Sequence, residues 1–220
     1  ILNGRSDARL RVSEMPLLLA LEPNMNYRWT RRSFYRARGI SFPEGLLFED
    51  APAHFDLLLG ARQVALSSTV YYLYRVNRPG KITEEKGERR FDIIPVSRIA
   101  IEVLLRENPN PWVAACGLRI LFRLCWGCGT MVPLSRRHAF FREVVRPFQK
   151  LPEPWLQSYF GGKIIDSSHR LLGFLISRQM FAALYLLTLG RDLLLYLGGS
   201  RIREAARRPD AGKGYSRRGV

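Results

Sequence analysis

Four segments after Pro95 carry apolar residues at helical spacing, and no other feature of the sequence limits the fold as strongly. These segments are 97–106, 112–126, 136–149 and 169–197. Prolines separate most of them, and a period near 3.6 residues predicts amphipathic helices. We therefore expect residues 96–200 to form a mostly α-helical region.

The first 95 residues have a different, mixed pattern. A short helix is expected within 26–38, where Gly39 supplies the stop signal, and a second helix is expected from Asp50 to Gly60. Short apolar runs predict three strands, at 46–48, 63–67 and 70–76, and the last run is rich in Tyr and Val. Residues 1–95 are thus expected to be an α/β region.

The charge of the chain favours anionic partners. It contains 35 Lys and Arg against 19 Asp and Glu, a formal net charge of +16. Nucleic acid, anionic lipid and the phosphates of a nucleotide all suit such a charge. Residues 201–220 carry seven Lys or Arg against two acids, so we expect a loose basic tail there. A hydrophobic content of 47% excludes a disordered chain.

Residues 169–197 are expected to form one long amphipathic helix. Its polar residues, among them Arg170, Arg178 and Arg191, fall in one sector, and the rest is mainly Leu, Phe, Tyr and Ala. Only 11 residues between Gln179 and Arg191 are free of strongly polar groups, against the ~20 that a membrane span requires. The helix either packs on its own domain or lies in a membrane interface.

Two of the three cysteines form a C-W-G-C motif, Cys125 and Cys128. This spacing occurs in redox pairs and in half of a zinc site. The sequence offers no second pair at zinc-ligand spacing, and the flanking residues have the pattern of a buried helix face. We therefore expect reduced, buried thiols, which suit a cytosolic setting.

The stretch from residue 26 to residue 83 contains the most informative motifs. It begins N-Y-R-W-T-R-R-S-F-Y-R-A-R, continues G-I-S-F-P-E-G-L-L-F-E-D-A-P-A-H, and later contains Y-Y-L-Y-R-V-N-R-P-G-K-I-T. Four elements follow in order: a basic aromatic segment, a Gly-Ile-x-Phe-Pro-Glu-Gly approach, a Glu-Asp pair opening a helix, and a tyrosine-rich segment before a loop.

These elements, over about residues 20–95, resemble the second half of the catalytic domain of family-2 glycosyltransferases. The resemblance implies a partial GT-A fold, which is α/β and Rossmann-like, followed by the helical region. It implies transfer of a sugar from a nucleotide-sugar donor to an acceptor hydroxyl, with inversion, in polysaccharide or glycolipid synthesis. Residues 1–95 would then be the acceptor-side portion of the domain.

The resemblance implies that Asp50 is the catalytic base and that Glu49 either supports it or contacts the acceptor. An inverting transfer needs a base that deprotonates the acceptor hydroxyl, and a carboxylate at the start of a helix is held rigidly. The helix N-terminus is expected to lower the pKa of Asp50. The alternative is that Asp50 serves only as a helix N-cap.

Several cations and one histidine complete the expected substrate site. Arg75, Arg78 and Lys81 would stabilise the leaving diphosphate, although exposed loop cations have the same pattern. His54 lies one helical turn after Asp50 and would contact donor or acceptor, or would serve a structural role. Arg28 and Arg32 match the basic segment of the family only in part.

The donor-binding half of such an enzyme is not recognisable here. The sequence contains no Asp-x-Asp motif, whose carboxylates would hold a divalent metal (Mg or Mn) on the diphosphate. We therefore expect that metal only in the full-length enzyme. Because the chain begins with Ile1, we expect a cut inside a longer protein, and exposed surface that the other half would cover.

The expected partners are a nucleotide-sugar donor, a saccharide or lipid-linked acceptor, and an anionic membrane surface. The expected location is cytoplasmic, peripheral on the inner face of the membrane.

Two other functions compete with this one: a basic nucleic-acid-binding module, and a peripheral membrane or scaffold protein without catalysis. Nucleic acid is disfavoured, because the cations are spread along the chain and no nucleic-acid-binding motif is present.

Overall fold

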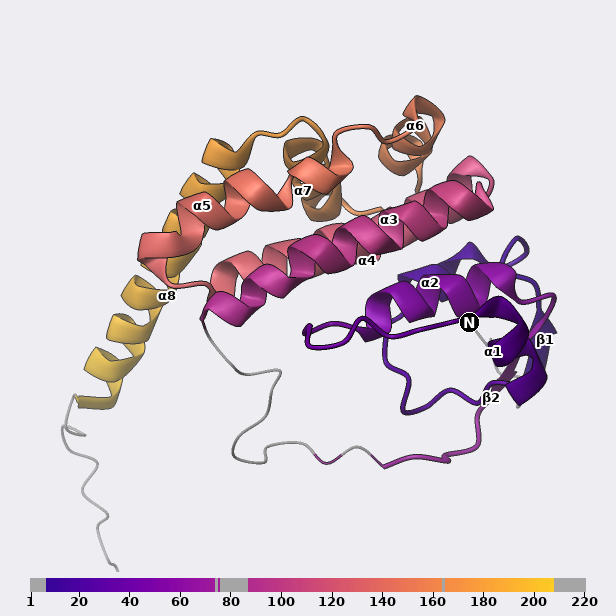
Figure 1. Ribbon diagram of the computed structural model, residues 1–220. Coiled ribbons are helices and arrows are strands. Elements are labelled where there is room, and N and C mark those ends of the chain that lie inside the picture. The colour runs from indigo at the N-terminus through magenta and orange to yellow at the C-terminus, as the bar shows by residue number, and fades with distance from the viewer. Residues whose placement is uncertain (1–6, 74, 76–86, 164, 208–220) are drawn as a thin grey trace, which may run out of the picture.

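The computed structural model describes residues 7–73, 75, 87–163 and 165–207, the last ten of these only as helical backbone (Figure 1). Two helices run through its centre: α3 (Ile93–Glu107) and α4 (Pro111–Met131). Asn108 ends α3 with a left-handed φ of 42°, and the side chain of Asn110 caps α4 by accepting from Val113 N at 3.0 Å. The two helices lie side by side along the molecule.

Helix α4 is the centre of the fold, because most other elements pack on it. On its surface lie the 3-10 turn η1 (Pro16–Ala20) and helices α5 (Leu134–Val144), α6 (Glu153–Gly161) and α7 (Ser167–Ser177). Helix α8 (Phe181–Arg207) packs on α5 and α7. One hydrophobic cluster contains side chains from both sides of residue 95, including Leu19, Phe55, Leu104 and Phe122.

The N-terminal helices are short and end where the glycines predict. Helix α1 (Arg32–Arg38) stops at Gly39, which has a left-handed φ of 62°. Helix α2 (Asp50–Gly60) has the predicted bounds and packs on α3. Two further 3-10 turns flank the long helices, η3 (Glu88–Asp92) and η4 (Arg146–Phe148).

A two-stranded antiparallel sheet is the only sheet in the described residues. Strand β1 (Asp7–Leu10) pairs with β2 (Val64–Ser67), with Asp7 opposite Ser67 and Leu10 opposite Val64. The predicted strand at 63–67 is therefore confirmed as β2, although its partner comes from the start of the chain.

The predicted α/β, Rossmann-like fold is wrong. Helices account for 65% and strands for 4% of the structure over the residues that it describes, so the fold is mostly helical. The predicted strand at 46–48 is a turn, in which Phe48 has a φ of 67° and Leu47 N donates to the Asp92 carboxylate at 3.0 Å. Residues 70–73 are exposed and pair with no strand within the described chain. A short apolar run does not make a strand without a neighbouring strand to bond.

The long helix predicted at 169–197 is also corrected, because two helices occupy this region. The break lies between Ser177 and Phe181, where Gln179 has a positive φ of 55° and Met180 N donates to Leu175 O at 2.8 Å. The break contains neither proline nor glycine, the residues that usually announce one. Its consequence is that α7 and α8 point in different directions (Figure 1).

The cysteines are buried free thiols, as expected. Cys116, Cys125 and Cys128 all lie in the core on α4. Burial raises the pKa of Cys116 to about 11 and the pKa of both Cys125 and Cys128 to about 12. The Cys125 sulfur lies 3.4 Å from the hydroxyl of Ser97 on α3. These thiols therefore pack as small apolar groups.

One helix in the described residues, α4, is long and apolar enough to cross a membrane, and 67% of its most apolar window is buried inside the molecule. Length and composition are shared by spanning helices and by core helices, but burial under other helices distinguishes them. Because α5, α6, α7 and η1 cover it, α4 is a core helix of this fold.

Candidate functional site

Three of the predicted site residues gather at the N-terminal end of α2. Asp50 is the first residue of the helix, His54 lies one turn later, and Arg28 comes from the loop between η1 and α1. The charge of Arg28 influences both Asp50 and His54, which places the three side chains in one electrostatic neighbourhood. We call Arg28, Asp50 and His54 the Asp50 cluster.

Asp50 is half-buried and is not the N-cap of α2. Glu49 occupies the cap position, and the first bond of the turn runs from Ala51 N to Phe48 O at 2.9 Å. The interpretation of Asp50 as a simple N-cap is therefore wrong. Its carboxylate remains available for another role.

The pKa of Asp50 is raised, which is opposite to the sequence-based expectation. Burial is the largest cause, and the adjacent Glu49 carboxylate adds to it. The backbone N–H of Met25 and the charge of Arg28 act in the opposite direction but do not outweigh burial. A higher pKa makes this carboxylate a stronger base than an ordinary aspartate.

Arg28 is held by a compact loop. Its Nη2 donates to Glu22 O at 3.1 Å, and the same carbonyl accepts from the Tyr27 hydroxyl at 2.5 Å. The carboxylate of Glu22 in turn pairs with Arg123 on α4, which ties the loop to the core helix. Burial lowers the pKa of Arg28, yet a guanidinium stays charged at neutral pH. Its Nη1 is buried without a hydrogen-bond partner.

His54 is fully buried, and its Nε2 donates to Leu19 O at 3.1 Å. Burial and the charge of Arg28 lower its pKa to about 3, so the ring is neutral at physiological pH. The proton is on Nε2, because a carbonyl only accepts, and Nδ1 keeps a lone pair. Nδ1 is buried without a partner. Of the two roles that the sequence left open, this contact favours the structural one: His54 joins α2 to η1.

The remaining predicted site residues do not join the Asp50 cluster. Glu49 is adjacent and half-buried, whereas Arg32 and Arg75 are exposed and are not among the groups that shift the pKa of Asp50. Arg78 and Lys81 lie outside the described residues. The structure therefore brings together one base, one cation and one neutral imidazole.

The chemistry available to this cluster is acid–base chemistry beside a fixed positive charge. A partly desolvated carboxylate can accept a proton from a hydroxyl placed at its open side. An arginine with an unused N–H can donate to an anionic or hydroxyl oxygen. Within the described residues, no group of three or more His, Cys, Asp or Glu could hold a metal ion, so the Asp50 cluster does not fit a metal site.

No family model, curated protein or solved structure matches this chain.

A partly buried ion-pair network that the sequence did not indicate lies next to α2. Arg38 at the end of α1 donates to Asp56 at 2.5 Å and to Glu107 at 2.7 Å, and Arg106 pairs with the same two acids. The bonds from Arg38 are the main reason that the pKa of Glu107 is lowered. This network joins the C-terminal ends of α1 and α3 to Asp56 in the middle of α2, and so fixes the helix that carries Asp50.

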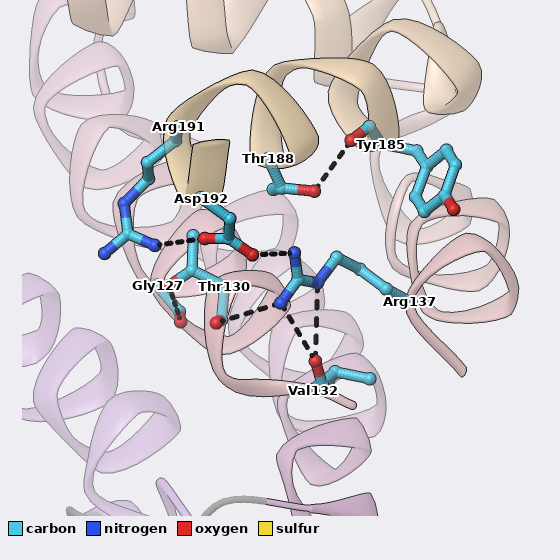
Figure 2. A network of polar contacts seen from close by, with 8 residues as sticks. All are labelled: Gly127, Thr130, Val132, Arg137, Tyr185, Thr188, Arg191 and Asp192. Carbon is cyan, nitrogen blue, oxygen red and sulfur yellow. Dashed lines mark hydrogen bonds and ion pairs between the residues drawn. The ribbon is translucent and has the colours of Figure 1, made fainter. Parts of the chain in front are cut away.

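A second network joins α4, α5 and α8 (Figure 2). Arg137 is buried, and its guanidinium lies 2.6 Å from the Asp192 carboxylate on α8. It also donates to the Val132 and Thr130 carbonyls, which lie at the end of α4. From the sequence, Asp192 is expected only in the polar sector of its helix, because its partner Arg137 is 55 residues away.

Two hollows lie away from the Asp50 cluster, along α7 and α8. One, of about 400 Å³, is lined by Trp126, Leu171, Leu172 and Leu187 with Arg123, Ser168 and His169 at its edge. The other, of about 650 Å³, is lined by Leu171, Leu175, Ala183, Leu186, Leu187, Gly190, Arg191 and Leu194. Both are shallow and mostly apolar, so they are not sites for the chemistry of Asp50.

Proposed function

We propose that this chain is the acceptor-side part of a nucleotide-sugar-dependent glycosyltransferase, with Asp50 as the catalytic base. The observation that carries the proposal is a half-buried carboxylate with a raised pKa, at the start of α2 and beside Arg28. The family-2 motifs of the sequence name the same residue. A helical scaffold does not weaken the proposal, because function depends on the groups in a site more than on the fold.

In the proposed reaction, the Asp50 carboxylate accepts the proton of an acceptor hydroxyl. The hydroxyl oxygen then bonds to the anomeric carbon of the donor sugar, and the bond from that carbon to the nucleotide diphosphate breaks on the opposite face. The configuration is inverted, and the proton remains on Asp50. Glu49 assists by keeping the pKa of Asp50 high, and Arg28 supplies a fixed positive charge beside the reacting carboxylate.

The donor would be held by protein outside these 220 residues. The chain has no Asp-x-Asp motif, so a Mg or Mn ion on the diphosphate would be bound by that other part. Large apolar side chains are exposed where such a part could dock: Trp29 is 83% exposed and Leu73 86% exposed, and the rings of Trp29 and Tyr71 lie 5.2 Å apart. Exposed apolar patches mark interaction sites.

The acceptor is a saccharide or a lipid-linked saccharide, and the enzyme acts in the cytoplasm, peripheral on the inner face of the membrane. The net charge of +16 supports an anionic surface as a partner. The exposed apolar side chains of α7 and α8 and the basic residues of 201–220 support the same location.

The test is sugar transfer by the complete enzyme that contains this chain. Asp50→Asn is expected to reduce kcat by about 10²–10⁴-fold, the usual contribution of a general base. The matched control is Glu102→Gln, which removes an exposed acid on α3, outside the Asp50 cluster and outside the ion pairs that hold α2, and is expected to retain most activity. The acid limb of the pH–rate profile is expected above the range of an ordinary aspartate, and to disappear in Asp50→Asn.

Unchanged turnover by Asp50→Asn would remove Asp50 as the base. Salt-sensitive binding to single-stranded or duplex DNA, without any turnover of nucleotide sugars by the complete enzyme, would support the nucleic-acid alternative instead. Circular dichroism of both variants checks that neither result reflects unfolding.

A further inference from the structure

The surroundings of helix α8 change at Leu193, where the helix stops packing on the rest of the molecule. Its first half packs on the body: Leu184 and Thr188 are buried, and the ring of Tyr185 lies 5.7 Å from the ring of His138 on α5. The Arg137–Asp192 ion pair is the last described polar link between α8 and α5. Beyond it the helix continues past the end of α5 (Figure 1).

The five side chains after Asp192 are large, apolar and exposed, at 48–73% of their surface: Leu193, Leu194, Leu195, Tyr196 and Leu197. We call these residues the α8 tip. Five successive residues pass through more than one full turn of a helix, so the tip is apolar on every side. A helix that is apolar all round is normally surrounded by protein or by lipid.

The apolar surface of the tip extends along the body of the molecule. Leu194 also lines the hollow between α7 and α8, together with Leu171, Leu175 and Leu187. Leu171 and Leu186 are themselves exposed. The result is a continuous apolar surface that runs from the hollow to the tip, larger than isolated surface leucines would give.

The length of the tip suits insertion into one side of a bilayer. The uncharged run from 193 to 199 lies between Asp192 and Ser200, and at 1.5 Å per residue it measures about 10 Å. Interfacial helices enter the boundary of headgroups and acyl chains by about 5–10 Å, whereas a span requires about 30 Å. The tip can therefore enter a membrane surface but cannot cross it.

The positive charge of the residues that follow the tip favours anionic lipid, rather than another protein, as the partner of the tip. Residues 201–220 contain seven Lys or Arg and two acids. Basic residues next to an inserted apolar segment contribute about 1 kcal/mol each on an anionic surface. An apolar tip followed at once by cations matches the order of layers in a membrane surface, with acyl chains inside and phosphates outside.

We propose that the α8 tip inserts into the surface of an anionic membrane while the basic residues after it contact the lipid phosphates. This assigns a specific segment to the membrane contact, and it rests on the peripheral location proposed above. It does not require sugar transfer. Failure of the vesicle experiment below would leave the role of Asp50 intact, and failure of the Asp50 experiment would leave vesicle binding intact.

The experiment is co-sedimentation of the 220-residue chain with vesicles of phosphatidylcholine, with and without phosphatidylglycerol. Strong binding is expected only to the anionic vesicles, weakening as salt is raised. The triple variant Leu193→Ser, Leu194→Ser, Leu197→Ser is expected to lower the partition coefficient at least tenfold. The matched control is Val70→Ser with Leu73→Ser, which removes equally exposed apolar side chains elsewhere and is expected to bind as the unchanged chain does.

A spectroscopic variant reports insertion directly. Tyr196→Trp is expected to show a blue shift of its fluorescence when anionic vesicles are added, because the indole leaves water. Either of two results would overturn the proposal: no binding of the unchanged chain to anionic vesicles, or equal binding of the triple variant. A dimer in sedimentation equilibrium that the triple variant dissociates, without vesicle binding, would show that a second copy covers the tip instead.

Discussion

The guanidinium of Arg137 on α5 lies 2.6 Å from the carboxylate of Asp192 on α8, and the same side chain donates to the last carbonyls of α4. One arginine therefore connects three helices. It satisfies carbonyl groups that the end of a helix leaves unbonded, and it fixes the direction in which α8 leaves the body.

Replacing Arg137 with Leu is expected to lower the free energy of unfolding by about 2 kcal/mol, because carbonyls and a carboxylate lose their partner. The loss is moderated since the Asp192 side chain is 41% exposed. Urea denaturation measures it. The neighbouring Arg136→Leu is the control: its pair with Glu88 is exposed, so a change within about 1 kcal/mol is expected. Equal losses in both variants would contradict the role of Arg137.

Two glycines on α4 should respond oppositely to alanine. A Cβ at Gly129 would lie 2.3 Å from the Phe141 ring, so Gly129→Ala is expected to destabilise by about 1–3 kcal/mol. A Cβ at Gly127 would meet nothing within 4 Å, so Gly127→Ala is expected to stabilise by up to about 1 kcal/mol. Thermal denaturation of the two variants measures both changes in stability. A stabilising Gly129→Ala would show that α5 does not pack closely on α4.

His54 should make the protein sensitive to mild acid. Its pKa is about 3 in the folded chain and 6.5 in an exposed histidine, so only the unfolded chain binds this proton between those values. Stability is therefore complete above pH 6.5 and falls as the pH is lowered, by about 2 kcal/mol between pH 7 and pH 5 from this residue. Urea denaturation at several pH values measures the slope.

His54→Gln is expected to remove that part of the slope, while its amide can still donate to Leu19 O. Ser97→Ala is a suitable control, because it alters another buried polar side chain that does not titrate in this range. If His54→Gln kept the whole acid sensitivity, the buried neutral state of His54 would be wrong.

The three thiols should be protected from modification until the chain unfolds. Burial raises the pKa of each cysteine, so little reactive thiolate exists at pH 8, and reagents cannot reach it. With a coloured disulfide reagent, we expect negligible reaction of the native chain over minutes and reaction of all three thiols in guanidinium chloride. Rapid modification of one thiol in the native chain would show that α4 opens locally.

Local patterns predicted the helices well. Helix α2 has the predicted bounds because it begins within the Glu49–Asp50 pair and ends at Gly60, and α3 and α4 follow the spacing of apolar residues. The predictions that failed concern features that depend on residues distant in the sequence. The run at 70–73 has the composition of a strand but no strand to pair with in the described chain, and Gln179 interrupts a helix without any local signal.

The candidate site shows the same contrast between features set by local sequence and features set by distant partners. Asp50 and His54 are four residues apart on one helix, so their proximity follows from sequence spacing. The carbonyl of Leu19 and the guanidinium of Arg28 reach them only through the packing of η1 and its loop. The predicted direction of the pKa shift of Asp50 was therefore wrong. The sequence shows the helix N-terminus, which lowers this pKa, but it does not show the burial, which raises the pKa by more.

The pairing of β1 with β2 closes the chain into a ring that contains residues 11–63, and with them the whole Asp50 cluster. Closing a long ring has an entropic cost that grows only slowly with its length, so a few ladder bonds can maintain it. The two strands thus close the segment that carries Arg28, Asp50 and His54, and they add to the α2–α3 packing that keeps these residues in one folded unit.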